Sequence, residues 1–316
     1  MTMNRNRRLF LKAASAGALG AWLPGDGLFR TPPADGAAEK VRVAVVRNEK
    51  AISTRNVVDR RQTALMIDAA LQAITGKRNI HDAWTVLGVT RDDVIGIKVN
   101  CNTWTILLET HPELVYALCD SLANVVPPNN IIIYERFTHE LKRSGYEINK
   151  GTQGVRCFGN DEGGGYRGEL TCIVTDACTK IINMPTLKTV EGEFAGSLFL
   201  KNHIGSIPLG AMTDCHGNAD YCTEVCNRQA LRSKTLLAFC DGLRGTYKRG
   251  VPWYYGGIIM SRDQIAAECA ALSIVNEKRA RERESPLAIP GYVRRAGSLG
   301  LGVADPGRIE VVNSVL

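Results

Sequence analysis

Apolar residues follow two alternating patterns along this chain, short β-branched runs and longer stretches with helical spacing. The short runs predict buried strands at residues 41–46, 94–99, 131–134, 171–174, 180–183, 236–240 and 258–260. The longer stretches predict helices at residues 57–74, 110–126, 194–204 and 262–283. We expect the first helix to end at Gly76 and the second to begin with a capping box formed by Thr110 and Glu113.

The alternation of strands and helices predicts the fold class. Strands separated by helices usually pair in parallel, so we expect an α/β fold with a mostly parallel sheet flanked by helices. Residues 39–316 are enough for a single domain of this kind. A less regular insert that contains cysteines is expected at about residues 184–232.

The first 38 residues have the layout of a twin-arginine export signal. Arg7 and Arg8 are adjacent, an apolar run follows at residues 13–23, and small residues suited to a peptidase lie at 34–38. The apolar run is shorter than the roughly 20 residues that span a bilayer, so no stable membrane span is expected. We therefore predict export by the twin-arginine machinery and a soluble mature protein that is periplasmic or secreted. This route carries folded proteins, which favours a bound metal or redox group.

The charge of the chain does not point to nucleic acid as a partner. The formal net charge is +7, and the predicted signal holds five basic and two acidic residues, so the mature chain carries about +4. A basic stripe interleaved with aromatic residues, which is typical of nucleic-acid binding, is absent from the sequence. We expect no nucleic-acid binding.

One local group of side chains is suited to binding a metal. Among ten cysteines, Cys215 is followed directly by His216, and Cys222 and Cys226 are four residues apart. If residues 220–232 are helical, the last two thiols lie on one face, as two ligands of one metal would. Three thiolates and one imidazole suit zinc or an iron–sulfur centre. A disulfide between Cys215 and one helix cysteine, or plain thiols, would also explain the pattern.

A second group of polar residues follows a predicted strand. Lys188 lies just after the strand at 180–183, where α/β folds place ligand-binding loops. Lys201, Asn202 and His203 lie at the end of the next predicted helix. We expect the two lysines to receive a phosphate or carboxylate, with Asn202 as an orienting donor. His203, with Lys201 and Lys188, is the candidate for acid–base catalysis. Alternatively, the lysines only satisfy the last carbonyls of a helix.

Several segments, taken in chain order, resemble one known family. The central segments read Asn-Met-Pro-Thr-Leu-Lys-Thr at 183–189 and Leu-Lys-Asn-His-Ile-Gly at 200–205. Further matching segments lie at residues 97–100, 131–135, 240–245, 261–263 and 299–310. Together they resemble the domain-of-unknown-function family number 362, from about residue 41 to the C-terminus.

The resemblance implies an α/β fold and indicates which polar residues bind the ligand, namely Lys98, Lys188, Lys201, Asn202 and Asp263. As an alternative, Asp263 caps the helix that follows it. Some members of the family contain iron–sulfur ferredoxin segments, which favours a metal at the cysteines. This chain departs from the family in having no ferredoxin cysteine run and in having Val190 where relatives often have a histidine.

These features support two hypotheses about function. The first is an exported redox or metal-dependent enzyme that acts on an anionic small molecule, with a metal ion or an iron–sulfur cluster as cofactor. The alternative is a non-catalytic periplasmic binding or accessory protein whose cysteines are paired in disulfides. The metal content of the protein separates the two hypotheses.

Overall fold

The computed structural model describes residues 40–102, 108–190 and 192–316, all within the unit Glu39–Leu316. The predicted export signal at residues 1–38 lies outside the described residues. Among the residues that are described, no helix has the length and apolar character needed to cross a membrane.

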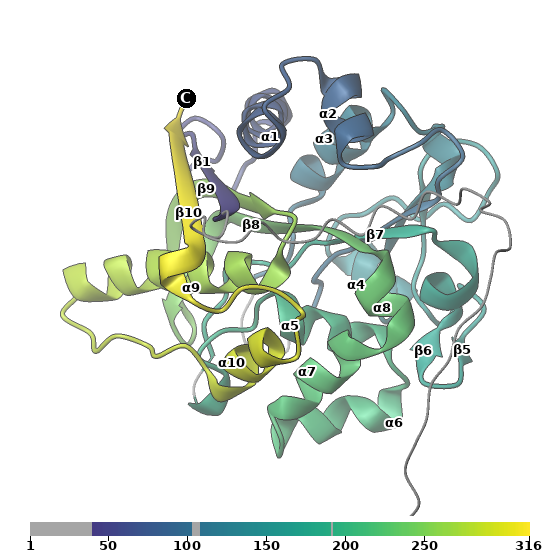
Figure 1. Ribbon diagram of the computed structural model, residues 1–316. Coiled ribbons are helices and arrows are strands. Elements are labelled where there is room, and N and C mark those ends of the chain that lie inside the picture. Colours follow the sequence, from purple (N-terminus) through teal and green to yellow (C-terminus); the bar gives the residue numbers. More distant parts are fainter. Residues whose placement is uncertain (1–39, 103–107, 191) are drawn as a thin grey trace, which may run out of the picture. The chain divides into compact units, whose positions relative to one another are not determined.

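The described residues form one eight-stranded sheet with the order β10-β1-β9-β8-β7-β2-β3-β4 (Figure 1). Its strands are β1 (Val41–Arg47), β2 (Ile95–Lys98), β3 (Ile131–Tyr134), β4 (Arg156–Cys157), β7 (Lys180–Asn183), β8 (Thr235–Lys248), β9 (Val251–Ser261) and β10 (Ile309–Val315). All neighbouring pairs are parallel except the two that involve β9, which runs antiparallel to β1 and β8. The predicted α/β fold with a mostly parallel sheet is confirmed.

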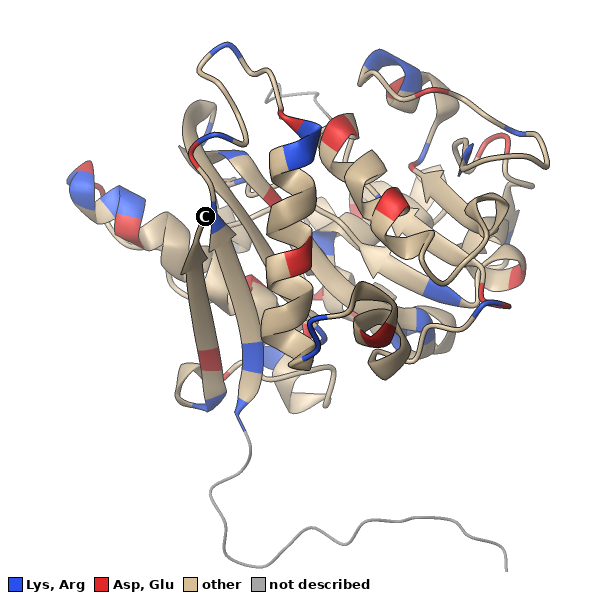
Figure 2. Ribbon diagram, turned by 90° about the horizontal axis from the view of Figure 1, so that it is seen from above, with Lys and Arg blue, Asp and Glu red and all other residues tan. Residues whose placement is uncertain are grey.

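Helices cover both faces of the sheet because the strands are apolar on both faces. Ile131 and Ile133 of β3 pack with α1 (Arg60–Thr75), α2 (Ile80–Val86) and α3 (Pro112–Leu122). Ile132 and Tyr134, which alternate with them, pack on the opposite side with α5 (Phe199–Asn202), α7 (Asp220–Asn227), α9 (Gln264–Arg281) and α10 (Gly291–Ser298). Figure 2 shows the charged residues mostly on helices and loops, with the strands largely free of them.

Two predicted helices have the expected ends. α1 ends at Thr75, and Gly76 follows in a left-handed conformation with φ of 72°, as predicted. Its N-terminus is capped by Asp59, which accepts hydrogen bonds from two backbone N–H groups. α9 begins directly after Asp263, whose carboxylate accepts from the backbone of Ile265 and Ala266. The capping alternative for Asp263 is confirmed.

The predicted capping box at Thr110 is wrong. α3 begins at Pro112, and its N-cap is His111, whose side chain makes no capping hydrogen bond. The Thr110 hydroxyl accepts instead from the backbone N–H of Asn100 at 2.9 Å and donates to the carbonyl of Met184 at 3.1 Å. Tertiary contacts to two strand ends therefore replace the local contact that the sequence pattern suggests.

Two further predictions need correction. The strand predicted at 171–174 is reduced to β6 (Leu170–Thr171), which pairs with β5 (Tyr166–Arg167) and is followed by a π-helical turn, Ile173–Ala177. The helix predicted at 194–204 is only α5, continued by a 3₁₀ turn, His203–Ser206.

The connection from β7 to β8 consists of short helices. It contains α5, α6 (Leu209–Met212), the 3₁₀ turn Thr213–His216, α7 and α8 (Gln229–Lys234). The helix considered at 220–232 is thus divided at Arg228, which has extended backbone angles. One more short helix, α4 (Thr138–Arg143), follows β3. This connection and the loops after β2, β3 and β7 surround the candidate site.

Candidate functional site

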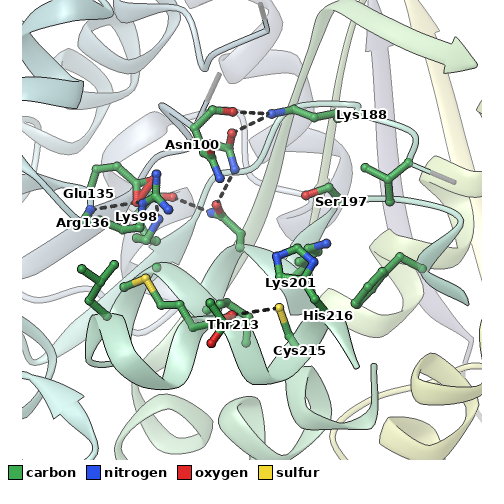
Figure 3. A pocket seen from close by; sticks show the side chains of 18 of the residues that line it. Lys98, Asn100, Glu135, Arg136, Lys188, Ser197, Lys201, Thr213, Cys215 and His216 are labelled. Atoms are coloured by element: carbon green, nitrogen blue, oxygen red, sulfur yellow. Dashed lines mark hydrogen bonds and ion pairs between the residues drawn. The ribbon is translucent and has the colours of Figure 1, made fainter. Parts of the chain in front are cut away.

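A cavity of about 770 Å³ lies at the carboxyl ends of three neighbouring parallel strands (Figure 3). Lys98 is the last residue of β2, Glu135 follows β3 directly, and Lys188 comes from the loop after β7. Because parallel strands bring their carboxyl ends to one edge of the sheet, side chains from distant parts of the chain meet there. The connection between β7 and β8 supplies much of the remaining wall.

Positive charge dominates the described lining of this cavity. The cationic residues of the lining are Lys98, Arg136, Lys188, Lys201 and Arg249. Among the described lining residues, Glu135 is the acidic one. Apolar side chains complete the wall, namely Val190, Phe194, Ile204, Leu209 and Met212. An organic molecule with an anionic group and an apolar body would match this lining.

Lys98 and Glu135 form a buried ion pair in the wall. Nζ of Lys98 donates to Oε2 of Glu135 at 2.8 Å, and the side chains are 1% and 2% exposed. Nζ also donates to the carbonyl of Val99 at 2.7 Å. The backbone N–H of Arg136 donates to Oε1 of Glu135 at 2.8 Å. The two charges therefore neutralise each other and hold the loops after β2 and β3 together.

Gly205 lies against this ion pair. A Cβ at this position would lie 2.7 Å from Oε1 of Glu135 and 2.7 Å from Nζ of Lys98. Both atoms are fixed by hydrogen bonds, so neither moves aside easily. The close approach of the 3₁₀ turn to the ion pair therefore requires glycine.

Arg136 is held by a second carboxylate. Its Nε donates to Oε2 of Glu140 at 3.1 Å, and a terminal guanidinium nitrogen also donates to Oε1 of Glu140. This forked pair within the segment that leads into α4 fixes the guanidinium at the cavity. Arg136 therefore contributes positive potential that its own carboxylate partner partly balances.

Lys188 is a buried cation with neutral partners. It is 5% exposed, and its Nζ donates to Oδ1 of Asn100 at 3.0 Å and to the carbonyl of Asn102 at 3.1 Å. The described residues give it no carboxylate at ion-pair distance. Burial lowers the pKa of Lys188 to about 8, although Glu135 opposes this shift. An anion in the cavity would supply the missing opposite charge.

A chain of amide groups sets the direction of these donors. Nδ2 of Asn100 donates to Oδ1 of Asn202 at 3.2 Å, and Nδ2 of Asn202 donates to Oδ1 of Asn183 at 2.9 Å. Asn183 in turn donates to Oε1 of Gln264 at 3.2 Å. Oδ1 of Asn100 is therefore left to accept from Lys188 (Figure 3). These hydrogen bonds fix the orientation of the Asn100 and Asn202 amides. The Lys188 ammonium, which donates to Asn100, therefore has a defined position.

Lys201 enters the cavity from the α5 segment. Its ammonium lies 3.6 Å from the ring centroid of Phe194, at cation–π distance. The imidazole of His216 meets the same ring edge-on, with centroids 6.5 Å apart. In the view of Figure 3, Lys188 lies in the upper part of the site and Lys201 lies below it. Two lysines predicted to receive an anion thus line one cavity.

The structure brings together four of the predicted ligand-binding residues, since Lys98, Lys188, Lys201 and Asn202 all line the cavity. It does not place His203 or Asp263 in that lining. Asp263 caps α9 and also accepts from the backbone N–H of Val303 at 2.8 Å.

His203, the predicted acid–base residue, is fully buried. Neither ring nitrogen has a hydrogen-bond partner, although the Gln264 amide is close enough to affect its titration. Burial, and then the charge of Lys98, lower the pKa of His203 to about 3. His203 is also outside the cavity lining, so in this structure its imidazole does not meet a ligand held there.

The four predicted metal ligands do not form a ligand set. Among the described residues, no three His, Cys, Asp or Glu side chains are grouped so that they could hold a metal ion. Cys226 is fully buried in α7, and its thiol donates to the carbonyl of Leu200 at 3.4 Å, whereas His216 is exposed. The thiols of Cys215 and Cys222 do contact each other. The disulfide expected as an alternative is not present either, since the described cysteines are free thiols.

The contact between two thiols changes their acidity in opposite directions. The interaction with the Cys222 thiol lowers the pKa of Cys215. The same interaction, with burial, raises the pKa of Cys222. Cys215 is therefore the member of the pair on which a thiolate is favoured.

Sequence reasoning did not single out Asn100, Glu135, Arg136 and Arg249 as candidates. The sequence did contain a signal for Glu135 and Arg136, because both directly follow an apolar strand. Lys188 was predicted from its similar position after a strand. What the sequence does not reveal is the strand order β7-β2-β3, which makes these loops neighbours. Arg249 lies in the turn between β8 and β9, far along the chain, and no local motif marks it.

No protein-family model, no curated protein and no solved structure matches this chain.

Proposed function

We propose that this domain binds a small organic anion in the cavity at the carboxyl edge of its sheet. The observation that carries this proposal is Lys188, a buried ammonium whose hydrogen-bond partners are the neutral oxygens of Asn100 and Asn102. A charge buried without an opposite charge costs free energy, and a carboxylate or phosphate beside it would offset that cost.

The other cavity residues define the kind of anion. Lys98 is neutralised by Glu135, and Arg136 is partly neutralised by Glu140, whereas the partners of Lys188 are neutral. We therefore expect Lys188 to contact the anionic group, with Lys201 beside it in the cavity lining. Asn202 does not contact the ligand directly in this proposal, because its amide is used to orient Asn100. The apolar wall then receives the carbon skeleton of the ligand.

The enzyme and binding-protein hypotheses share this step. The geometry of the cavity supports the binding of an anion. The metal-dependent reaction gains no support, because the described parts of Cys215, His216, Cys222 and Cys226 do not form a group that could hold a metal ion. Membership of family number 362 remains a proposal. It agrees with the site in one respect, since Lys98, Lys188, Lys201 and Asn202 all lie in the matching motifs.

Export by the twin-arginine route also remains a proposal, which rests on Arg7 and Arg8. Replacing both by lysine keeps the charge and removes the paired guanidinium groups. Fractionation of cells should then find the wild-type chain outside the cytoplasm and the Arg7→Lys/Arg8→Lys variant inside it. Equal export of both would reject the proposal.

Calorimetric titration tests the binding proposal directly. The titrants are inorganic phosphate and a series of mono- and dicarboxylates of increasing chain length. Lys188→Met and Lys201→Met should each weaken binding about ten- to hundredfold, as expected for a hydrogen bond to a charged group. Lys77→Met is the control, because Lys77 is exposed and outside the cavity lining. Failure of all these anions to bind, or equal losses in the control, would reject the proposal.

A further inference from the structure

Lys188 differs from the other lysines of the cavity in what its hydrogen bonds leave open. Its Nζ donates to Oδ1 of Asn100 at 3.0 Å and to the carbonyl of Asn102 at 3.1 Å (Figure 3). Both oxygens only accept, so each of them uses one hydrogen of Nζ. A neutral amine has two hydrogens and keeps both bonds, with its lone pair in the remaining position around Nζ. Because Lys188 lines the cavity, a molecule bound there is what this position can meet.

The other lysines that the structure describes lack this combination. Lys98 is paired with the carboxylate of Glu135, which favours its charged form. Lys201 lies over the ring of Phe194 at cation–π distance, which also favours the charged form. Lys234 donates to two backbone carbonyls, as an amine could, but it is outside the cavity lining. Lys188 is therefore the described lysine that can offer a neutral amine to a ligand in the cavity.

The surroundings of Lys188 favour loss of its proton. The side chain is 5% exposed, and its hydrogen-bond partners carry no charge. Burial lowers the pKa of Lys188 to about 8, against the opposing effect of Glu135. At pH 7 about one molecule in ten then holds the free amine, which is the nucleophilic form of lysine.

We propose that Nζ of Lys188 forms an imine with the carbonyl group of a small oxo acid held in the cavity. The cations of the lining would attract the carboxylate of the acid, and this part of the proposal rests on the proposed function. The apolar side chains of the lining, such as Phe194 and Met212, would contact its carbon chain. The carboxylate would also balance the positive charge that the nitrogen carries in the protonated imine.

The reaction is balanced without an oxidant or a reductant. The Lys188 ammonium gives one proton to water, and the lone pair of Nζ attacks the carbonyl carbon of the acid. The π electrons of the C=O bond pass to oxygen, which takes a proton from the nitrogen to give a carbinolamine. Its hydroxyl group takes up a proton from solvent and leaves as water while the C=N bond forms. Nζ keeps one hydrogen, which it can donate to Asn100 or Asn102.

The test is reductive trapping of the full chain with pyruvate as the probe. Sodium cyanoborohydride adds hydride to the protonated imine and gives a stable secondary amine. The product is analysed by intact mass and by peptide mapping. We expect one carboxyethyl group per chain, on Lys188, formed at least about tenfold faster than on Lys234 or any other lysine. No adduct on Lys188, or faster labelling of another lysine, would overturn the proposal.

Two variants make the test specific. Lys188→Arg keeps a positive charge but cannot form an imine, so the rapidly formed adduct should be absent. Lys77→Met is the control, because Lys77 is exposed and outside the cavity lining, and this variant should be labelled like the wild type. Peptide mapping of the wild type identifies the reacting residue even if Lys188→Arg does not fold. An adduct that forms equally fast in a folded Lys188→Arg variant would overturn the proposal.

Two further probes separate this inference from the proposed function. Lactate has the carboxylate of pyruvate but no carbonyl group beside it, and methyl pyruvate has the same ketone but no charge. If calorimetry shows that lactate and pyruvate bind but no adduct forms, the imine is rejected and the anion site is upheld.

Recruitment by the cavity cations predicts that Lys201→Met slows trapping of pyruvate about tenfold and leaves trapping of methyl pyruvate unchanged. If methyl pyruvate is trapped on Lys188 as fast as pyruvate, and Lys201→Met affects neither reaction, the imine is upheld and recruitment by the cations is rejected.

Discussion

Nζ of Lys98 and Oε2 of Glu135 lie 2.8 Å apart, and this buried ion pair joins the ends of two adjacent parallel strands at the cavity. Removing one partner of such a pair leaves a buried charge without compensation, which typically costs about 3–5 kcal/mol. We therefore predict that Glu135→Gln lowers the free energy of unfolding by about this amount. Chemical denaturation monitored by circular dichroism measures it.

The double variant Lys98→Met/Glu135→Leu is the control for this prediction. It removes both charges and keeps the side-chain volume, so it should be more stable than Glu135→Gln alone. A double variant that is no more stable than Glu135→Gln would contradict a role based on charge pairing.

Gly205 permits a second test of the same pair. The added methyl group of Gly205→Ala would meet Glu135 and Lys98 at 2.7 Å, and overpacking of this kind costs about 1–3 kcal/mol. We predict this loss of stability together with weaker anion binding, because the ion pair borders the site. Gly210→Ala is the matched control, since a Cβ at Gly210 in α6 meets no atom within 4 Å. Equal unfolding free energies for the two variants would refute the prediction.

Anion binding should depend on the protonation of Lys188. Burial lowers the pKa of this lysine to about 8, and only its protonated form attracts an anion. Affinity is therefore expected to be full below pH 8 and to fall as the pH rises through this value. Titrations between about pH 6.5 and pH 9.5, which bracket that pKa, should show the fall in the wild type. The Lys188→Met variant should bind weakly at every pH, and an unchanged inflection in this variant would assign the effect to another group.

Glu268 should make stability depend on pH. This carboxyl is fully buried in α9, and it accepts from the Leu200 N–H and the Tyr292 hydroxyl, each at 2.9 Å. Burial nevertheless raises the pKa of Glu268 from 4.5 to about 7. The folded state then holds a proton that the unfolded state releases, so this contribution is complete below pH 4.5 and is lost as pH rises to 7.

The expected size of this change is on the order of 3 kcal/mol, from the conversion of the pKa difference into free energy. Glu268→Gln should remove the slope between these two pH values, because the amide does not titrate. Unfolding free energies measured at half-unit pH steps provide the comparison. The prediction fails if the slope of the variant equals that of the wild type.

Much of this fold could be predicted because most of its strands are short, apolar and flanked by recognisable helix ends. The same pattern located Lys188, since a polar residue after a buried strand lies at the ligand-binding edge of an α/β sheet. For Asp263 the sequence allowed two roles, ligand binding and capping of the following helix. The structure shows that Asp263 caps α9.

What could not be predicted depends on contacts between distant parts of the chain. Thr110 matches a capping box locally, but its hydroxyl is used by Asn100 and Met184. His203 is polar and lies two residues after Lys201, yet it is buried in the 3₁₀ turn. Cys226 lies one turn from Cys222 as a ligand would, but Leu200 takes its hydrogen bond. In each case sequence spacing gives the local geometry but not the partner.

The position of β1 in the sheet has a consequence for the order of events during synthesis. Both of its neighbours, β9 and β10, lie far later in the chain, with Val43 opposite Ser261 and Val41 opposite Ile309. During synthesis β1 must therefore wait, unpaired and apolar, until β9 and β10 have been made. A chaperone that holds this segment would protect the growing chain from aggregation during that interval.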